Sequence, residues 1–327
     1  MAESPAEEPQ RRRVELGRLA APLLSAVLFL SIFYVPVLGV VLNLFAPLPL
    51  IYSSLRFGEG AGAGAALFSA LVVAAGSDPR TAAFYFLSYA LMALVMSRLM
   101  SRQSGLNAAA GYGAGVSMAA TAVFLYFALG MASGGGGYYD ELVKSAQTVI
   151  AEMISAYKKA GMQEEQLAIL SKNSPLIAKW SVSLIPGMAV SGYLLMAFCN
   201  YLSYKFLRSR WPGLKAPDDV SLLNWYPPDR TVFVFIAGMA LALLPNDAAR
   251  VAGINVLVVT VLVYSVAGSC VLRFWFEKIR FPKFLRMFSY ILILLQPFIA
   301  VAVAAMGLFD LWFDFRKIRR QAGVKEE

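Results

Sequence analysis

The sequence predicts an all-α protein that crosses a membrane many times. Eight or nine apolar stretches lie between Leu19 and Phe313, and almost every charged residue falls between them. Hydrophobic residues make up 59% of the 327 residues and charged residues only 15%, and the mean hydropathy is +0.63. A helix needs about 20 residues to cross a hydrocarbon core roughly 30 Å thick, whereas a barrel strand needs only about ten. We therefore expect a polytopic helical membrane protein, embedded in the lipid bilayer, with one helical insert and no large soluble domain.

The first five expected spans end at proline, glycine or charged residues. Pro36 separates the first span from the second, Pro47 bends the second, and a polar turn at 77–80 precedes the fourth. We expect spans at 19–34, 36–54, 60–75, 81–100 and 106–131. They form a first membrane block at 15–131, preceded by a disordered cytoplasmic tail at 1–14.

A polar insert at 132–179 interrupts the apolar pattern. It begins with the glycine run at 134–137, after which apolar residues recur every three or four positions and charged residues take the others. That spacing predicts an amphipathic helix, followed by a second, short helix at 164–170. The apolar positions are Tyr139, Leu142, Ala146, Val149, Ile150, Met153 and Tyr157. If the insert acts as a lid over a pocket, the glycine run supplies the hinge.

Further spans and a basic tail complete the pattern. We expect them at 180–206, 231–244, 251–272 and 288–313, within a second membrane block at 180–314. The tail then covers 315–327. Pro297 kinks the last of these spans.

Clusters of Lys and Arg set the expected orientation, because cytoplasmic loops carry an excess of cations. The clusters at 11–18, 98–102, 205–215 and 273–286 agree on a cytoplasmic N-terminus and an insert on the outside. A fifth cluster at 316–320 follows after a single apolar segment. That segment either crosses and leaves these cations outside, or is re-entrant at Gln296 and Pro297. We favour a kinked crossing helix.

Composition gives no sign of catalysis, a cofactor or a metal site. The chain has no His and two cysteines, Cys199 and Cys270, which lack the spacing of a metal or redox motif. The net charge of +9 is spread over helix ends, so no nucleic-acid partner is expected. Asp310 and Asp314 lie one helical turn apart, but the neighbouring Arg316 favours ion-paired anchoring over catalysis. We expect a protein that is not an enzyme and carries no cofactor.

Small residues recur four positions apart in two spans. Gly60 and Gly64 lie in the third span, and Gly111 and Gly115 lie in the fifth. Such spacing lets helix backbones approach closely in a membrane. Internal helix packing is the simpler interpretation, and the alternative is a docking face for a partner subunit.

Polar and aromatic residues gather toward the expected outer ends of the spans. An interfacial aromatic belt explains most of them. Asn43 lies deeper, and a buried amide needs hydrogen-bond partners in hydrocarbon. A pocket for a small neutral or aromatic solute would combine such an amide with hydroxyls and rings. The candidate substrate-binding residues are Tyr34, Asn43, Tyr85, Ser88, Tyr126, Trp180 and Ser183.

Several short motifs, taken in order, resemble a known family. They are YVPVLG at 34–39, PLP at 47–49, RFG at 56–58, GLFD at 307–310 and DFRK at 314–317. This order is similar to that of the YybS-like family of predicted bacterial membrane proteins, domain of unknown function family 2232, over nearly the full chain. The resemblance implies the bacterial inner (cytoplasmic) membrane.

That family in turn resembles the substrate-binding S components of energy-coupling factor transporters. The resemblance implies a six-helix core that holds a vitamin or metal ion in an outward pocket, topples in the membrane and docks on a membrane coupling subunit driven by separate ATPase subunits. S components often present small residues four apart on the first helix, where Ala21 and Ser25 stand here. Our hypothesis is a transport protein for an unknown small solute. The alternative is a non-transporting membrane scaffold for envelope or signalling proteins.

Overall fold

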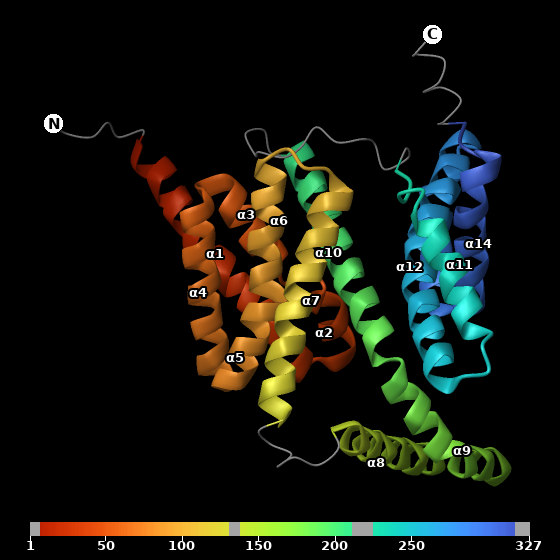
Figure 1. Cartoon of the computed structure of the whole chain (residues 1–327). Helices are drawn as coiled ribbons and strands as arrows, with labels where there is room; N and C mark the ends of the chain where they lie inside the picture. Colours follow the sequence, from red (N-terminus) through yellow and green to blue (C-terminus); the bar gives the residue numbers. More distant parts are fainter. Residues whose placement is uncertain (1–6, 131–137, 211–224, 318–327) are drawn as a thin grey trace. The chain divides into compact units, whose positions relative to one another are not determined.

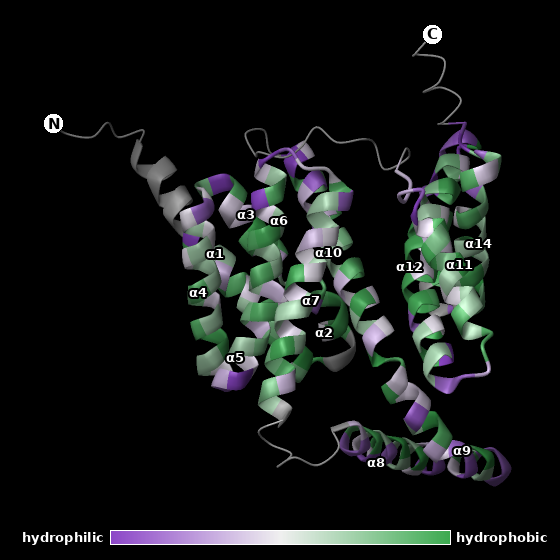
Figure 2. Ribbon diagram, viewed as in Figure 1, coloured by the Kyte–Doolittle hydropathy of each residue, from purple (hydrophilic) through white to green (hydrophobic). Residues whose placement is uncertain are grey.

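The computed structural model describes residues 7–130, 138–210 and 225–317 (Figure 1). Every regular element in these ranges is a helix, and seven helices are long and apolar enough to cross a membrane. The number rises to eight if one bent pair of helices counts as a span. The spans are mostly apolar. Polar residues lie at helix ends and along the helices labelled α8 (Tyr138–Lys159) and α9 (Glu164–Ser183) (Figure 2). The predicted polytopic all-α membrane fold is therefore confirmed.

The chain divides into two compact units. The first unit comprises Met1–Gly135 and Gly192–Asp219, and the second comprises Gly136–Ser191 and Val220–Glu327. The predicted basic cluster at 205–215 and the glycine run at 134–137 fall partly or wholly outside the described residues.

The first unit contains five of the candidate spans and the C-terminal part of a sixth, which begins in the second unit. Two of them are interrupted: a turn separates α2 from α3, and a π-helical turn, η1, joins α5 to α6. The elements are α1 (Glu7–Tyr34), α2 (Pro36–Asn43), α3 (Leu48–Phe57), α4 (Glu59–Gly76), α5 (Pro79–Tyr85), η1 (Phe86–Ala90), α6 (Leu91–Ser101), α7 (Leu106–Gly130) and most of α10 (Ile185–Arg210).

The N-terminal tail differs from the prediction. Helix α1 begins at Glu7, so residues 7–14 are helical and not disordered. Glu, Gln and Arg fill much of this segment and are good helix formers, which allows the first span to extend beyond the apolar run. The remainder of the expected tail, residues 1–6, lies outside the described residues.

The second unit holds the insert and the last helices. Its elements are α8 (Tyr138–Lys159), α9 (Glu164–Ser183), the first turns of α10, α11 (Thr231–Ala242), α12 (Asp247–Lys278), α13 (Lys283–Leu295) and α14 (Pro297–Phe313). The predicted amphipathic helix is α8. Helix α9 is longer than the predicted helix at 164–170, because it continues through Pro175. Helix α11 has only 12 residues and falls short of the length of the long candidate spans.

Close glycine contacts join α11, α12 and α14. A Cβ atom at Gly253 would overlap the backbone of Ala242, so α12 begins beside the end of α11 and the two helices are antiparallel. A Cβ atom at Gly268 would overlap the backbone of Val303 on α14. These contacts are of the kind that drive helix association in membranes.

The last expected span is divided into two helices that meet at a sharp bend. Helices α13 and α14 differ in direction by 103°. Arg286 near the start of α13 donates to the carbonyls of Phe276 and Phe281, at the end of α12. Arg316, just after α14, donates to the carbonyl of Trp225, just before α11. Because α11 and α12 are antiparallel, both ends of the α13–α14 pair lie at the same end of the unit, as in the re-entrant alternative.

Residues at the bend explain why the helix does not continue. Gln296 has the extended backbone angles φ −115° and ψ 104°, and Pro297 cannot donate a backbone hydrogen bond. Together they break the apolar run into two helices. The bent pair brings Arg286 and Arg316, which lie on its two sides, to one end of the unit, and this arrangement agrees with the charge pattern under the re-entrant alternative.

Candidate functional site

The break between α2 and α3 is held by polar side chains from other spans. The Ser25 hydroxyl on α1 donates to the carbonyl of Ala46 at 2.6 Å, and the Asn200 amide on α10 donates to the carbonyl of Leu44 at 2.7 Å. Asn43, the last residue of α2, donates to the carbonyl of Phe29 on α1 at 3.1 Å. Irregular backbone within a membrane survives only where such partners satisfy it.

A second polar group surrounds the π-helical turn. The Tyr85 hydroxyl lies 2.5 Å from the Ser25 hydroxyl, which links this turn to the α2–α3 break. Ser88 lies 3.0 Å from the Thr121 hydroxyl on α7 and accepts a 2.8 Å hydrogen bond from Tyr193 on α10. π-helical turns inside α-helices occur frequently at functional sites.

We call these seven side chains the polar belt. Its members come from α1, α2, α5, η1, α7 and α10, and all are hydroxyls or amides without formal charge. They are Ser25, Asn43, Tyr85, Ser88, Thr121, Tyr193 and Asn200.

Aromatic rings border the polar belt on one side. The Phe29 ring lies 4.9 Å from that of Tyr85 and 5.1 Å from that of Tyr89, and the two tyrosine rings are stacked 5.9 Å apart. Offset and edge contacts of this kind are favourable between rings. Rings and neutral hydrogen-bonding groups are therefore next to one another inside the first unit.

One atom of the belt is left over. Asn200 is fully buried, and its amide nitrogen makes two hydrogen bonds, but its Oδ1 has no partner among the described residues. A buried acceptor without a partner carries a free-energy cost of about 1–3 kcal/mol. This oxygen is therefore the acceptor of the belt whose hydrogen bonding the described residues leave incomplete.

The structure brings together three of the seven predicted substrate-binding residues. Asn43, Tyr85 and Ser88 belong to the polar belt. Tyr34 and Tyr126 lie outside it, with 76% and 74% of their surface exposed, as expected of an interfacial aromatic belt.

The remaining two predicted residues belong to the second unit. Trp180 on α9 lines an apolar groove, and the Ser183 hydroxyl lies 3.1 Å from that of Tyr139 on α8. Their part in solute binding stays a prediction, as does that of the three residues within the belt.

Sequence reasoning missed Thr121, Tyr193 and Asn200. An asparagine within an apolar run was a usable signal for Asn200, since polar residues inside membrane spans are rare and often functional. Thr121 and Tyr193 gave no such signal, because hydroxyls are common in spans and can bond to their own helix.

The small residues singled out by spacing have two different environments. Ala21 and Ser25 are buried inside the first unit, where Ser25 belongs to the polar belt. A Cβ atom at any of the four glycines in the GxxxG pairs would meet nothing within 4 Å: Gly60, Gly64, Gly111 and Gly115. The described residues therefore do not use these four glycines for internal packing, and their faces are open.

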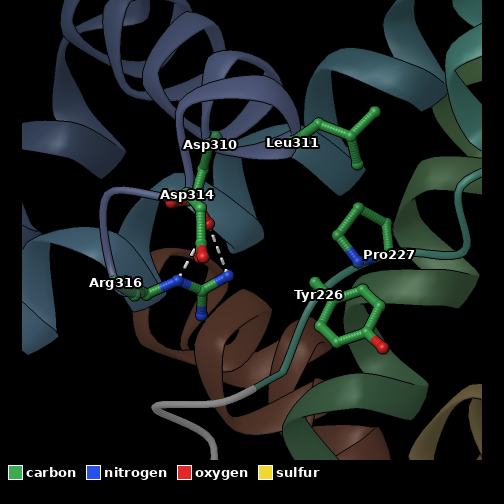
Figure 3. Close-up of a pocket in the computed structure, with 7 residues that line it drawn as sticks. Tyr226, Pro227, Asp310, Leu311, Asp314 and Arg316 are labelled. Atoms are coloured by element: carbon green, nitrogen blue, oxygen red, sulfur yellow. Dashed lines mark hydrogen bonds and ion pairs between the residues drawn. The ribbon is translucent and has the colours of Figure 1, made fainter. Parts of the chain in front are cut away.

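The second unit contains a buried ion pair at the C-terminal end of α14 (Figure 3). Arg316 approaches the Asp310 Oδ2 atom with Nη2 at 2.7 Å and Nε at 2.9 Å. The exposed fraction of Asp310 is 7% and that of Arg316 is 3%. The predicted ion-paired anchoring is thus confirmed for this pair.

A small cavity lies beside the ion pair. It has a volume of about 10 Å³ and is lined by Tyr226, Pro227 and Asp314 among others. The Asp310 Oδ1 atom is buried and has no partner among the described residues. The volume suits a single water molecule, which would complete the hydrogen bonding of the carboxylate.

No group of three or more His, Cys, Asp or Glu side chains among the described residues is placed to hold a metal ion. The polar belt contains hydroxyls and amides, which suit hydrogen bonding to an uncharged molecule better than metal coordination or acid–base chemistry.

Comparison with known proteins shows the family to which the sequence is similar. The family described as "Predicted membrane protein (DUF2232)" matches residues 23–311. The uncharacterized protein YybS of Bacillus subtilis (strain 168) is 22% identical over 303 residues, which cover 90% of this chain and 94% of that protein. No solved structure matches. The resemblance seen in the sequence motifs is therefore confirmed at the level of the family.

Proposed function

The chain belongs to the DUF2232 family of predicted membrane proteins, and on that premise we propose that it binds a small solute for transport. The proposed mode is that of the S components of energy-coupling factor transporters, with the first unit as the solute-binding core. The five candidate spans of this unit, with the part of a sixth that α10 contributes, are compatible with the six-helix core that the resemblance implies.

The polar belt is the observation that carries the proposal. It joins two interrupted spans inside a single unit, and interrupted helices with freed backbone groups form the binding sites of many membrane transporters. Because the belt holds no formal charge and borders stacked rings, the preferred solute is small, neutral and hydrogen-bonding, with an aromatic or other flat apolar part.

The open glycine faces on α4 and α7 support docking on a coupling subunit. A helix of a partner can approach closely where no side chain projects, and this contact needs no hydrophobic driving force. The chain contains no GxxxxGK[ST] motif, so ATP hydrolysis belongs to separate subunits in this proposal. We place the protein in the bacterial inner membrane with its N-terminus in the cytoplasm, following the cation pattern.

The test is native mass spectrometry of the full-length protein, extracted from its own membrane in a mild detergent. The proposal expects one retained metabolite per protein, or co-purifying ATPase subunits with a membrane coupling protein. Tyr85→Phe removes a belt hydroxyl and should lower the fraction of protein that retains the metabolite. Tyr112 on α7 is 64% exposed, and Tyr112→Phe should leave the fraction that retains the metabolite unchanged. Retention unchanged by Tyr85→Phe, with recovery of envelope or signalling proteins instead, would favour the scaffold.

A further inference from the structure

The hairpin formed by α8 and α9 leaves an apolar face uncovered. The apolar positions of α8 lie on one side of the helix, and Val149 and Met153 among them remain 55% and 46% exposed. On α9, Ile169 and Leu176 are seven residues apart and thus on one face, and both are more than half exposed. In water a surface of this kind is unfavourable, and it is typical of a helix that lies in a membrane interface.

A groove runs between this hairpin and the start of α10. Its volume is about 630 Å³, within the range of roughly 300–1,000 Å³ of small-molecule sites. The walls are almost wholly apolar. They include Leu142 and Ala146 from α8, Leu176, Ile177 and Trp180 from α9, and Met188 from α10. We call it the hairpin groove.

The walls of the hairpin groove are fixed by hydrogen bonds. The helix breaks between α9 and α10, and Asn255 on α12 spans the break: its Oδ1 accepts from the Gly187 amide at 2.6 Å, and its Nδ2 donates to the Ser183 carbonyl at 2.9 Å. We call this the Asn255 clamp. On the other side, the Tyr139 hydroxyl of α8 lies 3.1 Å from that of Ser183. Walls fixed in this way lower the ordering cost of binding.

The groove is continuous with a lipid-facing surface. Helices α9 and α10 together form one of the candidate spans. Met188, which lines the groove, is 61% exposed on that span. A groove whose wall is part of a membrane span opens toward hydrocarbon chains, so lipid reaches it without leaving the bilayer.

The charged residues beside the groove indicate which kind of lipid headgroup it would favour. Between residues 166 and 183 the charged side chains are Lys172 and Lys179, and no acidic residue is present. They are seven residues apart, so they lie on the same side of α9, next to Leu176 of the groove wall. Two lysines at the edge of an apolar groove suit a phosphate above a buried acyl chain.

From these observations we propose that the hairpin groove binds an anionic phospholipid of the surrounding bilayer. One acyl chain fills the groove, and the phosphate lies near Lys172 and Lys179. The site does not rest on the proposed binding of a solute at the polar belt, because all its residues belong to the second unit.

Native mass spectrometry of the full-length protein, delipidated and then titrated with phosphatidylglycerol or phosphatidylcholine, tests the site. Ala146→Trp should fill the groove and weaken the tightest lipid at least about tenfold, since even two displaced methylene groups account for that factor. Ala151→Trp adds the same bulk on the polar side of α8 and should leave binding unchanged. Replacing Lys172 and Lys179 by Gln should abolish the preference for phosphatidylglycerol.

A second readout does not depend on filling the groove. Phosphatidylglycerol with brominated acyl chains quenches nearby tryptophan fluorescence, and Trp180→Phe should remove the most strongly quenched component. Equal quenching in Trp180→Phe and wild type would overturn the proposal. Lipid binding that Ala146→Trp leaves unchanged would also overturn the proposal. If that variant changed the oligomeric state instead, the groove would be a protein-docking face.

Discussion

The two units interrupt a membrane span in different ways. In the first unit, the α2–α3 break takes hydrogen bonds from Ser25 and Asn200, and one oxygen of Asn200 remains without a partner among the described residues. In the second unit, the Asn255 clamp uses both ends of its amide to close the α9–α10 break. The α2–α3 break, with one unpaired acceptor beside it, is suited to binding an exchangeable ligand. The α9–α10 break, which both ends of the Asn255 amide satisfy, is suited to a structural role.

Charge sharpens the same contrast. The polar belt of the first unit is neutral, whereas the second unit buries the Asp310–Arg316 pair. A buried pair is costly to break because the remaining charge has no partner. Loss of a polar group should therefore affect stability most in the second unit and ligand binding most in the first.

The largest expected effect comes from Arg316→Met. It leaves the Asp310 carboxylate buried without its partner and should lower the free energy of unfolding by roughly 3–5 kcal/mol. Thermal unfolding of the detergent-solubilised protein measures the loss. Arg273→Met, which breaks an exposed pair with Glu277 at 3.1 Å, is the control and should cost less than about 1 kcal/mol. The double variant with Asp310→Leu should recover most of the stability, and equal losses in both single variants would contradict a special role for the buried pair.

The next effect is expected for Asn255→Leu. The change removes both bonds of the clamp and leaves the Ser183 carbonyl and the Gly187 amide unsatisfied, so stability should fall by about 1–3 kcal/mol. Solute retention should stay at the wild-type level, since the clamp lies in the second unit. Asn246→Leu, which removes the cap of α12 on an exposed residue, serves as the matched asparagine control and should cost about 1 kcal/mol. Loss of the solute without loss of stability would contradict the assignment of a structural role to the Asn255 clamp.

A smaller effect on stability, but a clear one on binding, is expected for Tyr85→Phe. One neutral hydrogen bond to Ser25 is lost, so the affinity for the retained solute should weaken roughly three- to tenfold. Titration of the purified protein with the metabolite found by mass spectrometry gives the dissociation constant. Stability should change by less than about 1.5 kcal/mol. A large loss of stability with unchanged affinity would make the belt a purely structural feature.

The smallest effect concerns the turn before α5, outside the spans. Hydrogen bonds from Thr81, and then from the Arg80 amide, hold the pKa of the exposed Asp78 carboxyl below its ordinary value of 3.8. The lowered pKa means that the contribution to stability is present above pH 3.8 and is lost as the pH falls through the folded-state value. Asp78→Ala should therefore lower the melting temperature by roughly 1–3 °C at pH 7. The difference from wild type should shrink in acid, and a difference that grew there would contradict the cap.

Apolar runs in the sequence predicted the type and order of the helices well, because each span must be apolar over most of its length. They did not predict where α9 ends or that α13 and α14 turn back. Pro175 lies within α9 without ending it, whereas Pro297 follows a residue with extended backbone angles, and the helix is interrupted there. Sequence alone does not distinguish these two outcomes, since both depend on tertiary contacts.

The candidate site was predicted only in part. Asn43 stood out as an amide inside an apolar run, and Asn200 and Asn255 carried the same signal. An interfacial belt was the simpler interpretation of the aromatic residues, but the sequence did not separate the exposed Tyr34 and Tyr126 from the buried Tyr85, because a membrane helix is apolar on all sides and gives no amphipathic pattern to orient it. The faces of spans become known only when their neighbours are in place.

The π-helical turn at η1 has a genetic consequence. Such a turn holds one residue more than an α-helical turn, so deleting a single codon within 86–90 would convert it to regular α-helix. Because the wide turn completes nearly the same rotation with its extra residue, the deletion would rotate α6 only slightly relative to α5. The buried row of Met92, Met96 and Met100 would keep its face, whereas a deletion within the regular turns of α6 would rotate the residues after it by about 100°. In a library of single-codon deletions, this segment should therefore tolerate the loss of one residue better than the α-helical turns on either side of it.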